Sequence, residues 1–357
     1  SPISYLSSAQ IAGLSTTAIK GLSATELQSL SATQMGAISN SGIAALSTSQ
    51  VSSLQTTQMS GLTAGQMSAL SGSQLVFDAG QLAVLNAVQI QGIGTDFTYL
   101  NTTQVHALSA TQVAALTATQ MASLTATDIN EFTTTQVGAL SATQVKALSA
   151  TQVKALSATQ VTALGATQLS GLTATTLSAL SATQMQALNA TQVKALTTTQ
   201  LAGLTATDMG ELGTTQLAAL STTQLAGLTA TDMSALNATQ VQALSATQVT
   251  ALTATQLTKL TATDMGEFSA TQVAALTTTQ LSSLTATSLS ALNATQTQAL
   301  GTTQVKSLST TQLAGLTATD LGDLTTTQVG ALSGSQLAAL SATQVKALSA
   351  TQVTALG

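Results

Sequence analysis

Hydrophobic and polar positions recur with a fixed period of eight along almost the whole chain. The run 141–164 reads SATQVKAL SATQVKAL SATQVTAL, and the same frame holds from Ser7 to Leu356 with one disturbance. We call each unit an octad and number it from its Ser or Thr, so that Leu is position eight. A short fixed period is typical of a solenoid or fibre, so we expect one continuous elongated domain.

Each octad carries the residues that start a helix. Position one is Ser or Thr in most octads and otherwise usually Asn, Gly or Asp78, which are the residues preferred at a helix N-cap. Position four is nearly always Gln, and Ser/Thr-x-x-Gln is a capping box. The apolar residue at position five and the Leu that precedes the cap have the spacing of a hydrophobic staple. The octad therefore predicts a helix that begins at position two.

Such a helix has only about six residues before the next cap, whereas an isolated helix needs about 12–15 residues to persist in water. Its stability must come from stacking on neighbouring helices. Positions five and eight share one face and supply the apolar contacts. The small residue at position seven permits close approach where one helix turns into the next. We predict an all-α fold, an elongated α-solenoid of short capped helices with one helix in each octad.

Two other folds compete with this prediction. A single uninterrupted helix would rotate about 800° in each octad, so its apolar stripe would spiral and leave no fixed face to bury. A β-solenoid remains the alternative, because Thr and Val favour strands. Positions five and eight, however, are an odd number of residues apart, which breaks the alternation of a half-buried strand.

The chain divides by regularity into three stretches. Residues 1–70 hold degenerate octads, which suggests an N-terminal capping or attachment region, because terminal repeats are usually atypical. Residues 71–100 contain two seven-residue units, 71–77 and 94–100, where the frame slips. Residues 101–357 form the regular array.

The slipped stretch holds three of the six aromatic residues, Phe77, Phe97 and Tyr99. We expect these rings to fill the space that the missing residues leave. The alternative is a bend or a contact between subunits, for which the three are the candidate residues.

A longer period of seven octads lies above the single octad, because 197–252 and 253–308 match as successive blocks. Recent duplication explains this period. Alternatively, it places acidic positions in a recurring relation around the superhelix, for contacts with neighbouring molecules.

Acidic residues occur as pairs three apart, on one face of a helix. The four pairs are Asp128/Glu131, Asp208/Glu211, Asp264/Glu267 and Asp320/Asp323, whereas Asp232 has no partner. Paired carboxylates can bind Ca²⁺ or act as acid and base, so these residues are weak candidates for a cation site. The simpler interpretation is that the position-four Asp stabilises the helix N-terminus.

Composition excludes several classes of function. The chain has no Arg, seven Lys and a net charge of −5, so it lacks the basic stripe of a nucleic-acid binder. It has no Cys and a single histidine, His106, and no apolar run approaches a membrane span. We expect no catalytic residues, no cofactor and no transmembrane segment.

Two surface features have competing explanations. Asn101, Asn189, Asn237 and Asn293 match N-glycosylation acceptors, but all four occupy position one, where N-capping explains them. The Thr of position three could order water as a lattice, which makes ice binding a lesser alternative function; solvated surface residues are the simpler interpretation.

Two resemblances bear on function. Leu-Thr-x-x-Gln-Val-x-Ala resembles the first helix of the repeats in TAL-effector DNA-binding proteins, but the chain lacks their second helix and basic strip, so DNA recognition does not carry over. The whole chain resembles the Ser/Thr/Gln-rich repeat arrays of bacterial secreted and cell-surface adhesin-like proteins, which implies an extracellular structural or adhesive role.

From these observations we expect a structural, non-enzymatic, extracellular or cell-surface protein that associates with itself into filaments or a surface layer. Few charges oppose such association. The alternative is the stalk or ligand-binding repeat region of an adhesin, with contact to a cell surface or a glycan.

Overall fold

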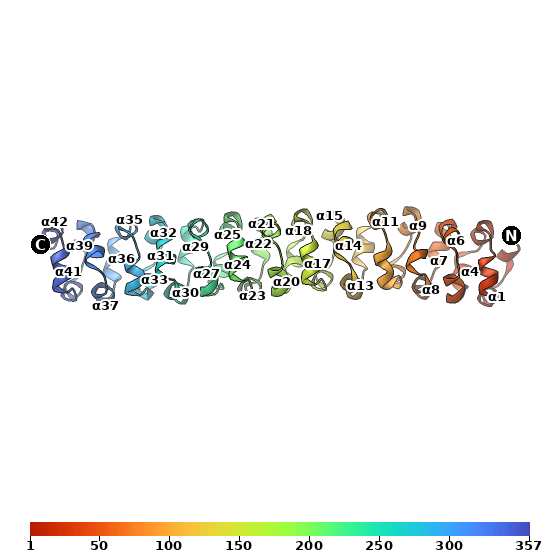
Figure 1. Cartoon of the computed structure of the whole chain (residues 1–357), viewed down its shortest axis with the longest axis horizontal. Helices are drawn as coiled ribbons and strands as arrows, with labels where there is room; N and C mark the ends of the chain where they lie inside the picture. Colours follow the sequence, from red (N-terminus) through yellow and green to blue (C-terminus); the bar gives the residue numbers. More distant parts are fainter. The chain divides into compact units, whose positions relative to one another are not determined.

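The computed structural model describes residues 1–357 and contains only helices. Its 42 α-helices have five or six residues each, and three 3-10 helices accompany them. Figure 1 follows these helices along the chain and shows no strand. The predicted all-α repeat fold is therefore confirmed, and the β-solenoid alternative is not supported.

The chain divides into two compact units, Ser1–Ala187 and Leu188–Gly357, each of which we describe by itself. The expectation of a single continuous domain stays a prediction. Unit 1 contains η1 (Pro2–Tyr5), α1 (Ser8–Ala12), α2 (Thr16–Lys20), α3 (Ala24–Gln28), α4 (Ala32–Ala37), α5 (Asn40–Ala44), α6 (Thr48–Ser53), α7 (Thr56–Gly61), α8 (Ala64–Ala69), η2 (Gly72–Gln74), α9 (Ala79–Ala83), α10 (Ala87–Gly92), η3 (Gly94–Tyr99), α11 (Thr102–Ala107), α12 (Ala110–Ala114), α13 (Ala118–Ser123), α14 (Ala126–Glu131), α15 (Thr134–Ala139), α16 (Ala142–Lys146), α17 (Ala150–Ala155), α18 (Ala158–Ala163), α19 (Ala166–Ser170), α20 (Ala174–Ser178) and α21 (Ala182–Ala187).

Unit 2 continues the same pattern. It contains α22 (Ala190–Ala195), α23 (Thr198–Ala202), α24 (Ala206–Glu211), α25 (Thr214–Ala219), α26 (Thr222–Ala226), α27 (Ala230–Ser234), α28 (Ala238–Gln242), α29 (Ala246–Thr250), α30 (Ala254–Lys259), α31 (Ala262–Gly266), α32 (Ala270–Ala275), α33 (Thr278–Ser283), α34 (Ala286–Ser290), α35 (Ala294–Gln298), α36 (Thr302–Ser307), α37 (Thr310–Ala314), α38 (Ala318–Gly322), α39 (Thr326–Gly330), α40 (Gly334–Ala338), α41 (Ala342–Ala347) and α42 (Ala350–Thr354).

The octad that begins at Ser149 shows how the sequence sets the local structure. Ser149 is the N-cap of α17, its hydroxyl accepts from the Gln152 amide, and the Gln152 side chain accepts from the Ser149 amide, which completes the capping box. The helix ends at Leu156, whose φ of −62° and ψ of 135° are extended. Position eight and the next N-cap thus form a two-residue extended connection between helices, as the restart signal predicts.

The core of each unit consists of the side chains at positions five and eight. In a typical octad of unit 1, Val145 and Leu148 are 0% and 3% exposed, whereas Thr143 and Lys146 at positions three and six are exposed. Near the end of unit 2, Val345 and Val353 are about half exposed because no turn of the solenoid covers them. The staple residues are therefore the core residues, which gives each short helix the packing that it needs.

Within each unit, helices pack on the helix three elements further along, as α12 packs on α15 and α30 on α33. Hydrogen bonds between successive turns join residues 24 to 31 positions apart, such as Gln91 to Ala115 and Gln144 to Val113. Gln144 also bonds to Leu116, which is 28 positions away. One turn of the solenoid therefore takes about three and a half octads.

The role predicted for position seven needs a correction. A Cβ on Gly61 at position seven would lie 2.2 Å from the carbonyl oxygen of Ala32, and one on Gly171 would lie 2.9 Å from that of Ala142. Both contacts join an octad to the octad three units before it. Small residues at position seven therefore allow close approach between successive turns, not between consecutive helices.

Candidate functional site

The most regular feature of both units is a ladder of buried glutamines at position four. The Gln144 side chain is 4% exposed, and its Oε1 accepts from the Ser141 amide at 2.9 Å. Its Nε2 donates to the carbonyl oxygens of Val113 and Leu116 on the preceding turn, at 3.0 and 2.8 Å. Each such amide caps its own helix and bridges two carbonyl groups of the preceding turn. The Leu116 carbonyl has no other partner, whereas the Val113 carbonyl also accepts from the Leu116 amide at 3.1 Å.

The ladder is interrupted in unit 2 wherever position four is not Gln. The five interrupting residues are Asp208, Asp232, Asp264, Ser288 and Asp320. Successive interrupting residues are separated by three and four octads in alternation. Because one turn takes about three and a half octads, an octad that is three or four units further along lies beside the first on the next turn. The interruptions therefore follow one another down the solenoid, one on each turn.

Contacts in unit 2 confirm that these five octads form one line, which we call the acidic column. Helix α24 packs on α27, and α31 packs on α34. The Ser234 hydroxyl of the second octad donates to Asp264 of the third at 2.8 Å, and Ser290 of the fourth donates to Asp320 of the fifth at 2.7 Å. All seven acidic residues of unit 2 lie in this column, because Glu211, Glu267 and Asp323 belong to the same octads as three of the Asp residues.

Asp cannot replace Gln fully at position four. The Asp264 carboxylate accepts from the Thr261 amide at 2.7 Å, so it keeps the cap. It has no proton donor for the preceding turn, and the Leu236 carbonyl, which a Gln would bridge, accepts no hydrogen bond in the structure. Asp264 thus caps the N-terminus of its helix, as expected for a position-four Asp. It also leaves a gap in the glutamine ladder.

In the Asp264/Glu267 pair, the carboxyl of Glu267 is partly buried and lies near the charge of Asp264. Glu267 has one carboxylate oxygen, Oε2, that is buried without a hydrogen-bond partner. Burial raises the pKa of the Glu267 carboxyl, and the nearby charge of Asp264 raises the same pKa further. In contrast, hydrogen bonds from the backbone and hydroxyl of Ser23 lower the pKa of the exposed Glu26.

In the corresponding pair of unit 1, Oε2 of Glu131 is likewise buried without a hydrogen-bond partner. Asp128 accepts from the Thr125 amide at 2.6 Å, and Glu131 accepts from the Thr102 hydroxyl at 3.0 Å. A ring nitrogen of His106 lies 2.7 Å from the backbone oxygen of Glu131, so the exposed histidine joins two turns.

Nowhere in the structure do three or more His, Asp or Glu side chains gather as metal ligands. The two residues of each acidic pair belong to one octad, and no third His, Asp or Glu joins any pair. The four Asn residues that match glycosylation acceptors are all helix N-caps that accept from the amide at position four.

The two slipped units lie on successive turns, because η2 packs on η3. Phe77 and Phe97 are each 2% exposed and belong to the core, so they fill space as expected. Tyr99 is 66% exposed and is the one of the three that a neighbouring subunit could contact. Its ring covers Gly72, where an added Cβ would lie 2.3 Å from the ring atoms.

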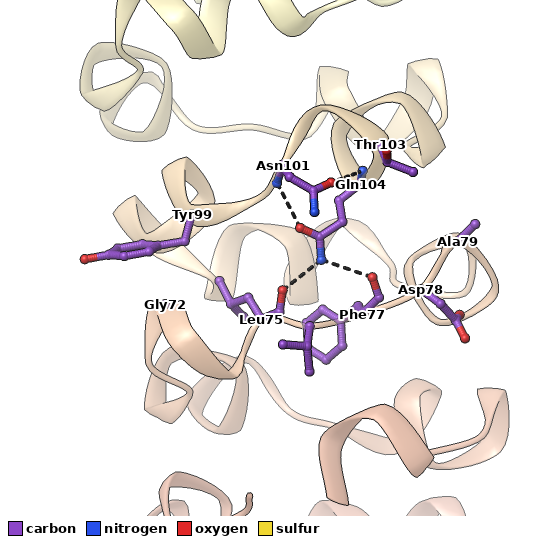
Figure 2. Close-up of a pocket in the computed structure, with 10 residues that line it drawn as sticks. Gly72, Leu75, Phe77, Asp78, Ala79, Tyr99, Asn101, Thr103 and Gln104 are labelled. Carbon is purple, nitrogen blue, oxygen red and sulfur yellow. Dashed lines mark hydrogen bonds between the residues drawn. The ribbon is translucent and has the colours of Figure 1, made fainter. Parts of the chain in front are cut away.

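A hollow of about 500 Å³ lies between the two slipped units and is lined by Tyr99, Val76, Asp78, Asn101 and Thr103 among others. Figure 2 shows Gln104 between Tyr99 and Asp78, which lie on opposite sides, with the Gln104 amide bridging the carbonyl groups of Leu75 and Phe77.

None of the helices is long and apolar enough to cross a membrane. Compared with known proteins, the chain matches no protein-family model and no curated protein.

The sequence indicated the individual acidic pairs and the aromatic residues, but not the acidic column or the hollow. The alternation between three and four octads could have revealed the column. Interpreting it requires the number of octads in a turn, which only the packing of the helices supplies.

Proposed function

We propose that this chain is a structural extracellular repeat protein that associates with itself into filaments or a surface layer. The observation that carries the proposal is the glutamine ladder, in which most octads bond to the turn before them as Gln144 does. Stability that is distributed over nearest-neighbour turns suits a load-bearing array.

The composition of the surface supports association. The exposed positions one, three and six carry mostly Ser, Thr and Ala, and charged residues make up 5% of the chain. Surfaces with so little charge offer little electrostatic repulsion between copies.

A second candidate function is the ligand-binding stalk of an adhesin. One observation favours it: an exposed tyrosine at the edge of a hollow, at the only disturbance of the octad frame.

Electron microscopy and sedimentation velocity of the purified chain over a range of concentrations test the first proposal. We expect filaments or sheets whose amount grows with concentration. A matched variant, Thr143→Lys with Thr151→Lys and Thr159→Lys, adds three charges at exposed position-three sites of consecutive octads. It should keep a helical circular dichroism spectrum and assemble less. Monomers at every concentration would contradict self-association and favour the stalk.

A further inference from the structure

Exposed large apolar side chains gather at the slipped units. Apart from Tyr5 near the first residue and Val345 and Val353 in the last turn, the exposed ones are Val76, Val88 and Tyr99, at 38%, 60% and 66%. Val76 and Tyr99 both line the hollow described above. An exposed aromatic ring at the rim of a concave surface is a common feature of binding sites.

The ring of Tyr99 is held in place by the fold. It occupies position seven, where other octads have mostly Ala, Gly or Ser, and it lies over Gly72 of the preceding turn. The shorter unit 71–77 has only three helical residues and leaves the helix at Leu75, and Val76 after it forms another part of the wall. The hollow thus has an apolar wall that the regular octads lack.

The other side of the hollow offers hydrogen-bonding atoms that the protein does not use. Asp78 and Asn101 are N-caps, and one oxygen of each accepts from a helix amide, at 2.8 and 3.0 Å. The second carboxylate oxygen of Asp78 and the amide nitrogen of Asn101 make no hydrogen bond in the structure, and the exposed Thr103 hydroxyl makes none. The site therefore presents both acceptors and a donor.

We propose that this hollow binds a neutral oligosaccharide. The apolar face of one pyranose would pack against Tyr99 and Val76, and hydroxyl groups of the neighbouring rings would bond to Asp78, Asn101 and Thr103 on the other side. The lining includes no Lys, Arg or His, so an anionic ligand would meet only the negative charge of Asp78. The volume of about 500 Å³ lies within the range of roughly 300–1,000 Å³ that is usual for small-ligand pockets.

A regular hollow in unit 2 provides an internal control. It has a volume of about 470 Å³ and is lined by Gly210, Thr214, Asn237 and Thr239 among others, with an N-cap Asn but no aromatic residue. If the N-caps and hydroxyls alone bound sugars, this hollow would bind them equally well. We expect only the hollow beside Tyr99 to bind the sugar, because only this hollow has an aromatic ring in its wall.

The chain allows a direct spectroscopic test, because it has no Trp and only two Tyr residues. In a Tyr5→Phe background, the tyrosine emission comes from Tyr99 alone. Titration of the full chain with maltotetraose, cellotetraose and tetra-N-acetylchitotetraose should change this emission for at least one sugar, and calorimetry should give the same dissociation constant.

Three variants test the roles of the residues without removing a helix signal. Tyr99→Ala restores the usual position-seven residue, and Asp78→Asn keeps an N-cap side chain. Each should weaken the binding measured by calorimetry about tenfold or more, which corresponds to roughly 1.4 kcal/mol. Asn237→Ser, in the regular hollow, should leave it unchanged.

Two results would overturn the proposal. One is the absence of binding by all three sugars at millimolar concentration. The other is sugar binding that Tyr99→Ala leaves unaltered. If Tyr99→Ala instead abolishes self-association while no sugar binds, the hollow is a contact between copies. The self-association proposal can fail independently, since a monomeric chain can still bind a sugar.

Discussion

At the scale of single residues, the glutamine of position four has two tasks that its side chain combines. The oxygen caps its own helix and the nitrogen bridges two carbonyl groups one turn away, as Gln144 shows. The position-four Asp residues can perform only the first task, because a carboxylate has no proton to donate. The residue at position four therefore decides whether an octad can donate hydrogen bonds to the preceding turn and stabilise the packing of the two turns.

Replacing Gln144 by Ala should therefore cost far more than a change at an exposed site. The Ser141 amide and the Leu116 carbonyl would lose their partner, whereas the Val113 carbonyl would keep its bond from the Leu116 amide. Unsatisfied buried polar groups cost about 1–3 kcal/mol each, so we expect a loss of roughly 2–5 kcal/mol. Urea denaturation followed by circular dichroism measures it. Thr143→Ala, at an exposed position of the same helix, should change stability by less than about 0.5 kcal/mol. Equal effects of the two substitutions would refute the bridging role.

The raised pKa of Glu267 predicts a pH-dependent cost. Because its carboxyl has a higher pKa in the folded state than in the unfolded chain, the ionised group opposes folding above the folded pKa, and the cost disappears as the pH falls below the unfolded pKa. Glu267→Gln should raise the melting temperature at pH 7 and have almost no effect at pH 3.

Glu26 provides a control of opposite sign for that experiment. Its pKa is lowered, so its ionised form favours folding above the unfolded pKa, and that contribution is lost as the pH falls through the folded pKa. Melting temperatures of Glu267→Gln and Glu26→Gln between pH 3 and pH 7 check the prediction. A Glu267→Gln gain that persists undiminished at pH 3 would show that packing, not charge, causes it.

At the scale of elements, each helix is too short to be stable alone and depends on the helices of adjacent turns. The close approach between turns occurs at position seven, where Gly61 of α7 faces the backbone of Ala32. A Cβ at Gly36 of α4 would likewise lie 2.7 Å from the Gly61 carbonyl oxygen, whereas a Cβ at Gly210 of α24 would meet no atom within 4 Å.

Gly61 and Gly210 should respond oppositely to the same substitution. Gly61→Ala places a methyl group against backbone atoms that cannot yield, so it should destabilise unit 1 by about 1–3 kcal/mol. Gly210→Ala should stabilise unit 2 by up to about 1 kcal/mol, through helix propensity. Thermal denaturation of the two variants beside the unaltered chain tests this contrast, which a stabilised Gly61→Ala variant would contradict.

At the scale of each whole unit, the turn of about three and a half octads does not contain a whole number of repeats. Two turns contain seven octads, which equals the longer period of the sequence. The acidic pairs of unit 2 therefore recur on the same side of the superhelix. This agrees with the interpretation that the longer period places acidic positions in a recurring relation around the superhelix. Duplication of the segment remains compatible with the same arrangement.

Removing whole octads should consequently be harmless, whereas removing a single turn should not. Deleting 253–308 joins Leu252 to Ser309 and keeps both the octad frame and the acidic column. Deleting 253–280 removes one turn but joins Leu252 to Leu281, which puts position five directly after position eight. We expect an unchanged melting temperature for the first variant and a clearly lower one for the second. A comparable loss in both would refute the octad as the unit of stability.

The sequence by itself determined everything that acts within one octad: where each helix begins, why it ends, and which two positions enter the core. Ser141, Gln144, Val145 and Leu148 lie within one octad, so their capping and staple signals are local. The tertiary structure decided which residues of the adjacent turns each octad contacts. The Gln144 amide bonds to carbonyl groups of the preceding turn, and the acidic column and the Tyr99 hollow likewise join residues from successive turns. Local signals set the length of each helix, but the packing of side chains between helices sets the angle between consecutive helices. That angle determines which residues of successive turns come into contact.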